Sequence, residues 1–326
     1  MENLRVAIVG CGRMGRERAS AATQLGARVV AVCDTNIQMA TACAAHFPHC
    51  RMVRDIRDLD WAALDAVFVC VPPYARGPVE VTAIHEGVPL FMEKPIGLSV
   101  VQCIPVQQAL ATRPVINAVG YMNRYRDSVQ RARQVMVGKT VLGVSGNWVG
   151  GPYHVPWWRQ QELSGGPVNE QATHLVDLVR YLVGEITAVH ALTPAPTGPQ
   201  ALCEAAVFAL HFAHGALGSL FYSCMASCKM INVQVFLSDM NIRLEGWDFQ
   251  WLEEGSHLPL PLPEPTRGNI FHAEVAAFLE AVSKDSSDPI LCDFTDAVQT
   301  QYVVDALKRS ILSGHIEQVV EVTALP

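Results

Sequence analysis

Residues Leu4-Arg5-Val6-Ala7-Ile8-Val9-Gly10-Cys11-Gly12-Arg13-Met14-Gly15 decide the fold of the N-terminal half. The apolar run 4–9 predicts a buried strand, and a helical pattern follows the glycines to about residue 25. Glycines spaced as GxGxxG between a strand and a helix let backbone amides approach a phosphate at the positive end of the helix. The stretch therefore predicts a dinucleotide-binding α/β unit. The residues expected at the phosphates are Gly10, Cys11, Gly12, Arg13, Met14 and Gly15.

The next predicted strand, 28–33, ends at Asp34, about 20 residues beyond the glycines. A carboxylate at this place accepts hydrogen bonds from the ribose diol of a dinucleotide and repels a 2′-phosphate. Thr35 and Asn36 follow, with no neighbouring arginine, so the charge pattern favours NAD over NADP. The alternative is that Asp34 caps the next helix, a role that Thr35 or Asn36 could also fill.

A later apolar strand runs from Val88 into Glu93-Lys94-Pro95. Pro95 restricts Lys94 to extended backbone geometry, so the ammonium has a defined direction. In a parallel sheet Lys94 emerges at the same edge as Asp34, and Pro72, after the strand 65–71, lies at that edge too. The pattern favours a functional lysine; the alternative is an ordinary solvated lysine at a strand end.

Composition bounds the remaining possibilities. The 326 residues suggest about two domains, and a chain that is 50% hydrophobic and 17% charged favours a packed protein that self-associates. A net charge of -7 without basic runs argues against nucleic acid and anionic membranes. The 10 cysteines form no CxxC pair, so no metal is expected. No signal peptide or long apolar span is evident, which predicts a cytoplasmic protein.

After about residue 137 the apolar period changes from 3.6 to 2. The segments 141–149, 186–192, 205–212, 216–224, 231–237, 242–245 and 247–252 predict strands of a meandering, mainly antiparallel sheet. Both faces carry apolar residues, so we expect one face to pack on helices and the other on a second subunit. This predicts a homo-dimer or homo-tetramer formed through the C-terminal sheet.

Within this half, a predicted helix at 169–183 places Glu170, His174, Asp177 and Tyr181 on one stripe. A carboxylate one turn before an imidazole can orient it and raise its basicity. We therefore predict His174 and Glu170, with Lys94, as catalytic residues. The alternative for His174 is a satisfied core histidine.

The segment before this helix is rich in aromatic residues. Flat tryptophan faces complement the apolar faces of sugar rings, and arginine or asparagine can bond hydroxyl groups. The alternative is that the two adjacent tryptophans only line a subunit contact. The residues predicted to bind the substrate are Lys94, Asn123, Tyr153, Trp157, Trp158, Arg159 and His174.

Together these motifs resemble the glucose-fructose oxidoreductase and inositol dehydrogenase (Gfo/Idh/MocA) family. The resemblance covers roughly residues 4–322 and implies an α/β Rossmann domain at 1–122 followed by an α+β domain at 123–326 with a large open, mainly antiparallel sheet. It also implies that the C-terminal helices pack back on the first domain. The motifs that carry it are the glycine loop, Asp34, Pro72-Pro73, Glu93-Lys94-Pro95 and Asn123-Arg124-Tyr125.

The resemblance further implies a lysine, Lys94, beside the nicotinamide, a cis Lys94–Pro95 peptide, and cofactor contacts from Pro72 and Glu93. The family usually has an aspartate where this chain has Glu170, and a histidine near the position of Arg76. The longer side chain of Glu170 leaves open whether it transfers protons or only orients His174.

The function implied is an NAD(P)-dependent dehydrogenase or reductase acting on CH–OH groups of a sugar, sugar derivative or cyclitol, a small-molecule substrate bound between the domains. Three alternatives stay open: recycled NAD used for glycoside cleavage or elimination, reduction of a non-sugar C=N, C=C or C=O group, and a non-catalytic nucleotide-binding protein.

Overall fold

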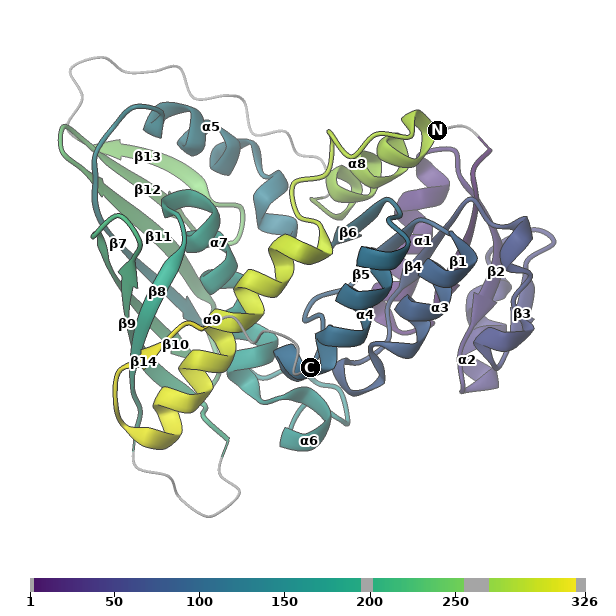
Figure 1. The fold of residues 1–326 in the computed structure, drawn as a ribbon, viewed down its shortest axis with the longest axis horizontal. Helices are drawn as coiled ribbons and strands as arrows, with labels where there is room; N and C mark the ends of the chain where they lie inside the picture. The colour runs from purple at the N-terminus through teal and green to yellow at the C-terminus, as the bar shows by residue number, and fades with distance from the viewer. Residues whose placement is uncertain (1–2, 195–201, 255–269, 321–326) are drawn as a thin grey trace. The chain divides into compact units, whose positions relative to one another are not determined.

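The computed structural model describes residues 3–194, 202–254 and 270–320, and the chain divides into two compact units (Figure 1). Unit 1 comprises Met1–Gly97, Val101–Met122 and Gly268–Val298, and unit 2 comprises Leu98–Val100, Asn123–Arg267 and Gln299–Pro326. The sequence prediction divides the chain at residues 122 and 123 and expects the C-terminal helices to pack back on the first domain. In the structure, Gly268–Val298 belongs to unit 1, and the chain returns to unit 2 at Gln299.

Unit 1 is built on a parallel sheet, sheet A, with six strands in the described residues and the order β3-β2-β1-β4-β5-β6. Neighbouring strands pair in parallel throughout. This confirms the predicted Rossmann class of the N-terminal half. The strands are β1 (Arg5–Val9), β2 (Arg28–Cys33), β3 (Arg51–Val53), β4 (Ala66–Val69), β5 (Leu90–Met92) and β6 (Asn117–Val119).

Three helices of unit 1, α1, α2 and α8, contribute to one hydrophobic core on sheet A. Phe278 of α8 lies 5.4 Å from Phe68 and 5.7 Å from Phe91 between ring centroids, so a late segment of the chain completes the core of the first unit. Helix α4 was not predicted, because Pro105 lies inside it and proline disfavours a helix interior. The helices are α1 (Arg13–Gln24), α2 (Ile37–Ala44), α3 (Pro78–Glu86), α4 (Val100–Thr112) and α8 (Ile270–Lys284).

Unit 2 is built on sheet B, whose eight strands in the described residues follow the order β13-β12-β11-β7-β10-β9-β8-β14. Among these pairings, β7 with β10 is parallel and the others are antiparallel, which confirms the predicted mainly antiparallel sheet. The strands are β7 (Val141–Val149), β8 (Ile186–Leu192), β9 (Ala205–Phe212), β10 (Leu217–Ser223), β11 (Met230–Leu237), β12 (Asn241–Glu245), β13 (Gln250–Glu254) and β14 (Glu317–Gln318).

The strand predicted at 247–252 begins later than expected. Gly246 and Phe249 have positive φ angles of 75° and 48°, which form a turn, so β13 starts only at Gln250. The two-residue strand β14 was also not predicted, since so short a segment has no readable period.

The inner face of sheet B packs on helices, in one core that includes residues of α5, α7 and α9. The opposite face is open within the described residues, because alternate residues of β9 and β10 are buried and exposed. The helices are α5 (Asp127–Met136), the short α6 (Gln161–Ser164), a π-helical segment η5 (Val168–Ala172), α7 (Thr173–Val183) and α9 (Phe294–Ser313). In the described parts of the chain, every helix is too short or too polar to cross a membrane.

Two close backbone approaches shape the glycine loop, residues 10–15. Gly10 has a φ of +91°, and a Cβ added to it would lie 2.6 Å from the carbonyl oxygen of Cys70. A Cβ on Gly15 would lie 1.9 Å from the carbonyl oxygen of Gly10. Gly12 differs, because a Cβ there would meet no atom of the described chain within 4 Å. Gly10 and Gly15 are therefore required by the fold, whereas Gly12 leaves space above the loop.

Substituting Gly15 and Gly12 by alanine should distinguish a glycine that the fold requires from one that it does not. Gly15→Ala should lower the free energy of unfolding by about 3 kcal/mol, because the new methyl group overlaps the Gly10 carbonyl and the backbone must shift. Gly12→Ala should change it by less than about 1 kcal/mol, since its extended φ suits alanine and only the helix cap weakens. Urea unfolding followed by circular dichroism measures both values. Equal losses in the two variants would contradict this account of the loop.

Candidate active site

The carboxyl ends of the strands of sheet A gather the predicted residues of unit 1 at one edge. The glycine loop follows β1, Asp34 follows β2, Pro72 comes shortly after β4, and Lys94 comes shortly after β5. Because these strands are parallel, their carboxyl ends lie at the same edge of the sheet. The amide of Gly10 donates to the carbonyl of Cys33 (2.8 Å), which joins the loop directly to the end of β2.

Asp34 is held against the glycine loop. Its Oδ2 accepts a hydrogen bond from the Cys11 amide, and its Oδ1 accepts one from the Asn36 amide, both at 2.8 Å. Asn36, not Asp34, caps α2, since its Oδ1 accepts from the Gln38 amide (3.0 Å). A carboxylate has about four acceptor positions, so Asp34 keeps capacity for further donors.

The structure adds an arginine near the segment that follows Asp34. Arg54 follows β3, which pairs with β2 in the register Cys33 with Val53. The Arg54 guanidinium donates from Nη2 to the carbonyl of Thr35 (3.4 Å). Strand pairing therefore brings the guanidinium of Arg54 to the carbonyl of Thr35, the residue after Asp34.

Two thiols beside the glycine loop, those of Cys11 and Cys33, have raised pKa values. Contact with the Cys43 thiol and burial raise the pKa of Cys11. Burial and the Asp34 carboxylate raise the pKa of Cys33 to about 12. Neither thiol therefore places a negative charge beneath the loop. In the described parts of the chain, no group of three or more histidine, cysteine, aspartate or glutamate side chains is arranged to hold a metal ion.

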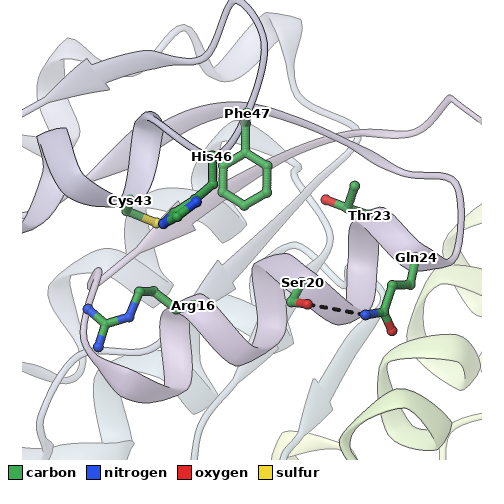
Figure 2. Close-up of a pocket in the computed structure, with 7 residues that line it drawn as sticks. All are labelled: Arg16, Ser20, Thr23, Gln24, Cys43, His46 and Phe47. Carbon is green, nitrogen blue, oxygen red and sulfur yellow. Dashed lines mark hydrogen bonds between the residues drawn. The ribbon is translucent and has the colours of Figure 1, made fainter.

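A pocket of about 370 Å³ lies between α1 and the end of α2 (Figure 2). Figure 2 shows Ser20 and Gln24 joined by a hydrogen bond along α1, with His46 and Phe47 across the pocket. None of its lining residues belongs to the predicted site, so this pocket has no assigned role. It is lined by Arg16, Ser20, Thr23, Gln24, Cys43, His46 and Phe47.

Lys94 extends from the end of β5 with constrained backbone geometry. The Glu93 amide donates to the Val69 carbonyl (2.9 Å), which continues the ladder to β4. The Lys94–Pro95 peptide is cis, as the family resemblance implies. The Lys94 side chain is half-buried, whereas Glu93 is buried and its carboxylate accepts from Arg18 Nε (2.6 Å). Arg18 is not among the predicted site residues, because sequence spacing does not connect it to Glu93.

In unit 2, the imidazole of His174 lies flat against Trp148. The ring centroids are 5.1 Å apart and the planes differ by 10°. Glu170 belongs to η5, so the predicted helix begins with a wider π turn, a feature common at functional sites. Trp148 is not in the predicted site, although its place on the buried face of β7 is consistent with the alternation of that strand.

Asp177 and Tyr181, predicted on the same stripe, anchor the helix instead. Asp177 Oδ1 lies 2.6 Å from Arg124 Nη2, and the Thr300 hydroxyl donates to the same oxygen (3.1 Å). The Tyr181 hydroxyl accepts from Gln130 Nε2 (2.8 Å). Arg124 is 1% exposed, so this ion pair is buried beneath α7.

The predicted substrate residues of unit 2 differ in exposure. Trp158 has no exposed surface and packs in the core of unit 2. Tyr153 and Trp157 are half-buried, and Arg159 is exposed. Asn123 is buried; its Oδ1 accepts from Arg126 Nε (3.1 Å), while its Nδ2 has no hydrogen-bond partner among the described residues.

Comparison with known protein families matches both halves of the chain. Residues 4–121 match the model described as oxidoreductase family, NAD-binding Rossmann fold. Residues 135–243 match the GFO/IDH/MocA C-terminal domain.

Individual relatives are distant. The chain is 24% identical to inositol 2-dehydrogenase of Burkholderia multivorans over 328 residues, 95% of this chain and 88% of the relative. It is 24% identical to levoglucosan dehydrogenase of Pseudarthrobacter phenanthrenivorans over 264 residues, 68% of this chain and 67% of the relative.

Solved structures share the fold. A levoglucosan dehydrogenase in complex with NADH superposes with a TM-score of 0.84 at 21% identity, covering 98% of this chain and 100% of the other. The WlbA dehydrogenase of Bordetella pertussis, in complex with NADH and UDP-GlcNAcA, superposes with a TM-score of 0.86 at 21% identity, covering 99% of this chain and 100% of the other. With both halves matched, the chain belongs to the Gfo/Idh/MocA family of oxidoreductases, and its first unit is that family's NAD-binding Rossmann fold.

Proposed function

We propose that the protein oxidises a secondary alcohol of a sugar, sugar derivative or cyclitol, or reduces the corresponding ketone, with NAD. The observation that carries the proposal is the shared edge of sheet A, from which the glycine loop, Asp34 and Lys94 all extend. The names of the relatives, inositol 2-dehydrogenase and levoglucosan dehydrogenase, support a polyhydroxylated substrate.

The residues of the edge fit a bound dinucleotide. The open space above Gly12 can admit a pyrophosphate, and the retained acceptor capacity of Asp34 suits ribose hydroxyls. We include Cys11, Arg13, Met14 and Pro72 among the cofactor contacts. When bound, NAD supplies the hydride acceptor for the alcohol carbon.

Lys94 and His174 act on the same hydroxyl group of the substrate in different roles. His174 takes the hydroxyl proton, and Lys94 hydrogen-bonds the same oxygen and stabilises its developing negative charge. Glu170 orients His174, and the stacked Trp148 ring restricts the plane of the imidazole. An imidazole with a fixed plane presents its nitrogen in one direction, which favours proton transfer.

Further side chains of unit 2 suit a polyhydroxylated substrate. The Asn123 amide nitrogen, which lacks a partner among the described residues, can donate to a hydroxyl. Tyr153 and Trp157 provide aromatic surface and Arg159 a charged donor. Trp158 is left out of this set because it is buried in the core.

The test of the function is reduction of NAD by the purified protein with a panel of inositols, aldoses, sugar acids and nucleotide sugars, followed by nicotinamide absorbance. With an active substrate, Lys94→Ala should lower kcat about 100-fold or more, because charge on the alcohol oxygen loses its donor. NAD affinity should change less than about threefold. Lys284→Ala, which removes an exposed lysine of α8, serves as the control and should keep wild-type turnover. Near-normal turnover of Lys94→Ala would contradict the assignment.

The pair Asp34 and Arg54 should set the choice between NAD and NADP. Asp34→Ser should weaken NAD binding about tenfold, a loss of about 1.4 kcal/mol, and should favour NADP because Arg54 can then bind the 2′-phosphate. Adding Arg54→Ala to Asp34→Ser should remove that gain, while Arg54→Ala alone should leave NAD binding nearly unchanged. Fluorescence titration with each cofactor measures these affinities. Tighter binding of NADP than of NAD by the wild type would refute the role given to Asp34.

We also propose that the open face of sheet B binds a second copy of this chain. Val207 of β9 and Phe221 of β10 are directly paired on this face and are 42% and 39% exposed, and Leu217 is 61% exposed. Exposed apolar side chains that adjoin across strands mark association surfaces.

Light scattering should therefore give a mass of two or four chains for the wild type. Phe221→Asp should shift it toward one chain, because a carboxylate would be buried without a partner at the contact. Leu312→Asp, at an 87% exposed position of α9, should leave the mass unchanged. A wild-type protein with the mass of a single chain would rule out this interface.

A further inference from the structure

Three ionisable side chains from separate parts of unit 1 meet in its interior, and one of them belongs to the residue that precedes Lys94. They are Arg18 of α1, Glu93 after β5, and Glu274 of α8, with exposures of 1%, 5% and 0%. Arg18 Nη2 lies 2.5 Å from Glu93 Oε1, and Arg18 Nη1 lies 2.5 Å from Glu274 Oε1. We call these three residues the Arg18 cluster.

Aromatic rings and backbone surround the Arg18 cluster closely and restrict its side chains. The guanidinium carbon of Arg18 lies 4.7 Å from the ring centroid of Phe91 and 5.1 Å from that of Phe271. On another side, a Cβ added to Gly120 would lie 3.2 Å from Arg18 Nη2 and 3.3 Å from Glu93 Oε2. The Glu93 carboxylate is therefore held in one position by charge, ring contacts and close backbone.

Stability does not explain such a cluster. Burying charged groups carries a desolvation cost that their mutual attraction often fails to exceed, and apolar residues of the same volume would pack as well. Two carboxylates also share one guanidinium, which leaves an excess negative charge. A buried arrangement with this composition is better explained by the geometry that it imposes on its members.

That geometry bears on Lys94. Phe91 and Glu93 both contact Arg18, and Lys94 is the residue that directly follows Glu93. The Glu93 backbone, which also bonds to Val69, therefore connects Arg18 to Lys94.

We propose that Arg18 is a positioning residue for the reaction, which holds Glu93 in place and thereby sets the direction of the Lys94 ammonium, and that the charge of Glu274 controls this hold by competing for Arg18. The inference rests on the proposed role of Lys94. In this proposal Glu93 positions Lys94, whereas the family resemblance implies that Glu93 contacts the cofactor. The two contacts that matter run from Nε and Nη2 of Arg18 to Oε1 of Glu93, because the single ammonium of lysine cannot reproduce both.

A proton on Glu274 balances the cluster. Burial, together with the Glu93 carboxylate and against the effect of Arg18, raises the pKa of Glu274 to about 7. The charged groups facing it are Arg18 on α1 and Glu93 after β5; burial raises the pKa of nearby Cys70, which stays neutral. Below pH 7 Arg18 therefore pairs chiefly with Glu93, and above it Glu274 competes for the same guanidinium.

The decisive experiment is a double-mutant cycle on kcat. Arg18→Lys should lower kcat about tenfold, since misdirected reacting groups lose rate steeply, with NAD affinity within about twofold. Because Arg18 acts through Lys94, Arg18→Lys combined with Lys94→Ala should be no slower than Lys94→Ala alone. Arg5→Lys, which alters a two-pronged but exposed pair with Asp65 in the same unit, should keep wild-type kcat.

The outcomes separate the two proposals. If no compound of the panel is oxidised, the proposed function fails; if Lys94→Ala keeps turnover, the proposed role of Lys94 fails and the cluster has nothing to position. If Lys94→Ala loses turnover but Arg18→Lys keeps it, or if the two losses multiply, the positioning role alone is overturned. Thermal unfolding of each variant gives the folded fraction used to normalise kcat, so a purely structural effect of Arg18→Lys cannot be mistaken for positioning.

Glu274→Gln provides a readout that packing alone would not change. In the wild type, the unfolded carboxyl loses its proton above about pH 4.5 and the folded one only near 7, so folding stability falls as pH rises between these values. The Tm of Glu274→Gln relative to wild type should therefore increase from pH 5 to pH 8. The ratio of its kcat to that of wild type should rise about threefold over the same range, because glutamine never competes for Arg18. Ratios that stay flat with pH would overturn the assignment of Glu274.

Discussion

The contact between Gly15 and the carbonyl of Gly10 is the constraint on which unit 1 depends. It lets α1 begin directly above the end of β1, while Gly10 itself passes close to the backbone that follows β4. With the loop drawn in this tightly, Asp34 can bond the Cys11 amide and Lys94 extends from the same edge of sheet A. The chemistry proposed for that edge is thus a consequence of missing side chains at two positions.

Each unit uses a buried arginine beside a residue of the proposed site. In unit 1, Arg18 holds Glu93, the neighbour of Lys94; in unit 2, Arg124 holds Asp177, three residues after His174 on the same helix. Buried pairs of this kind contribute little net stability but restrict their members to one geometry. The stacking of His174 on Trp148 adds a second restriction, on the plane of the ring rather than on the position of the helix.

Local patterns were sufficient where one physical signal dominated. The glycine spacing, the strand β2 ending at Asp34 and the alternation along β7 to β9 predicted their elements correctly. Prediction failed where signals conflicted. Helix α4 was missed because Pro105 lies inside it, and the start of β13 was placed too early because Gly246 and Phe249 form a turn. The stripe of Glu170, His174, Asp177 and Tyr181 was visible in sequence, but its last two members serve an anchor whose partners, Arg124 and Gln130, come from elsewhere.

The sequence by itself determined the parallel Rossmann class, the mainly antiparallel second sheet and the identity of Lys94 and His174 as candidates, because periodicity and glycine spacing are local properties. Only the tertiary structure decided that Arg54 reaches the carbonyl of Thr35, that Arg18 contacts both Glu93 and Glu274, and that Trp158 belongs to the core. The physical reason is that strand pairing and helix packing join residues remote in sequence, and such contacts leave no periodic trace in the chain.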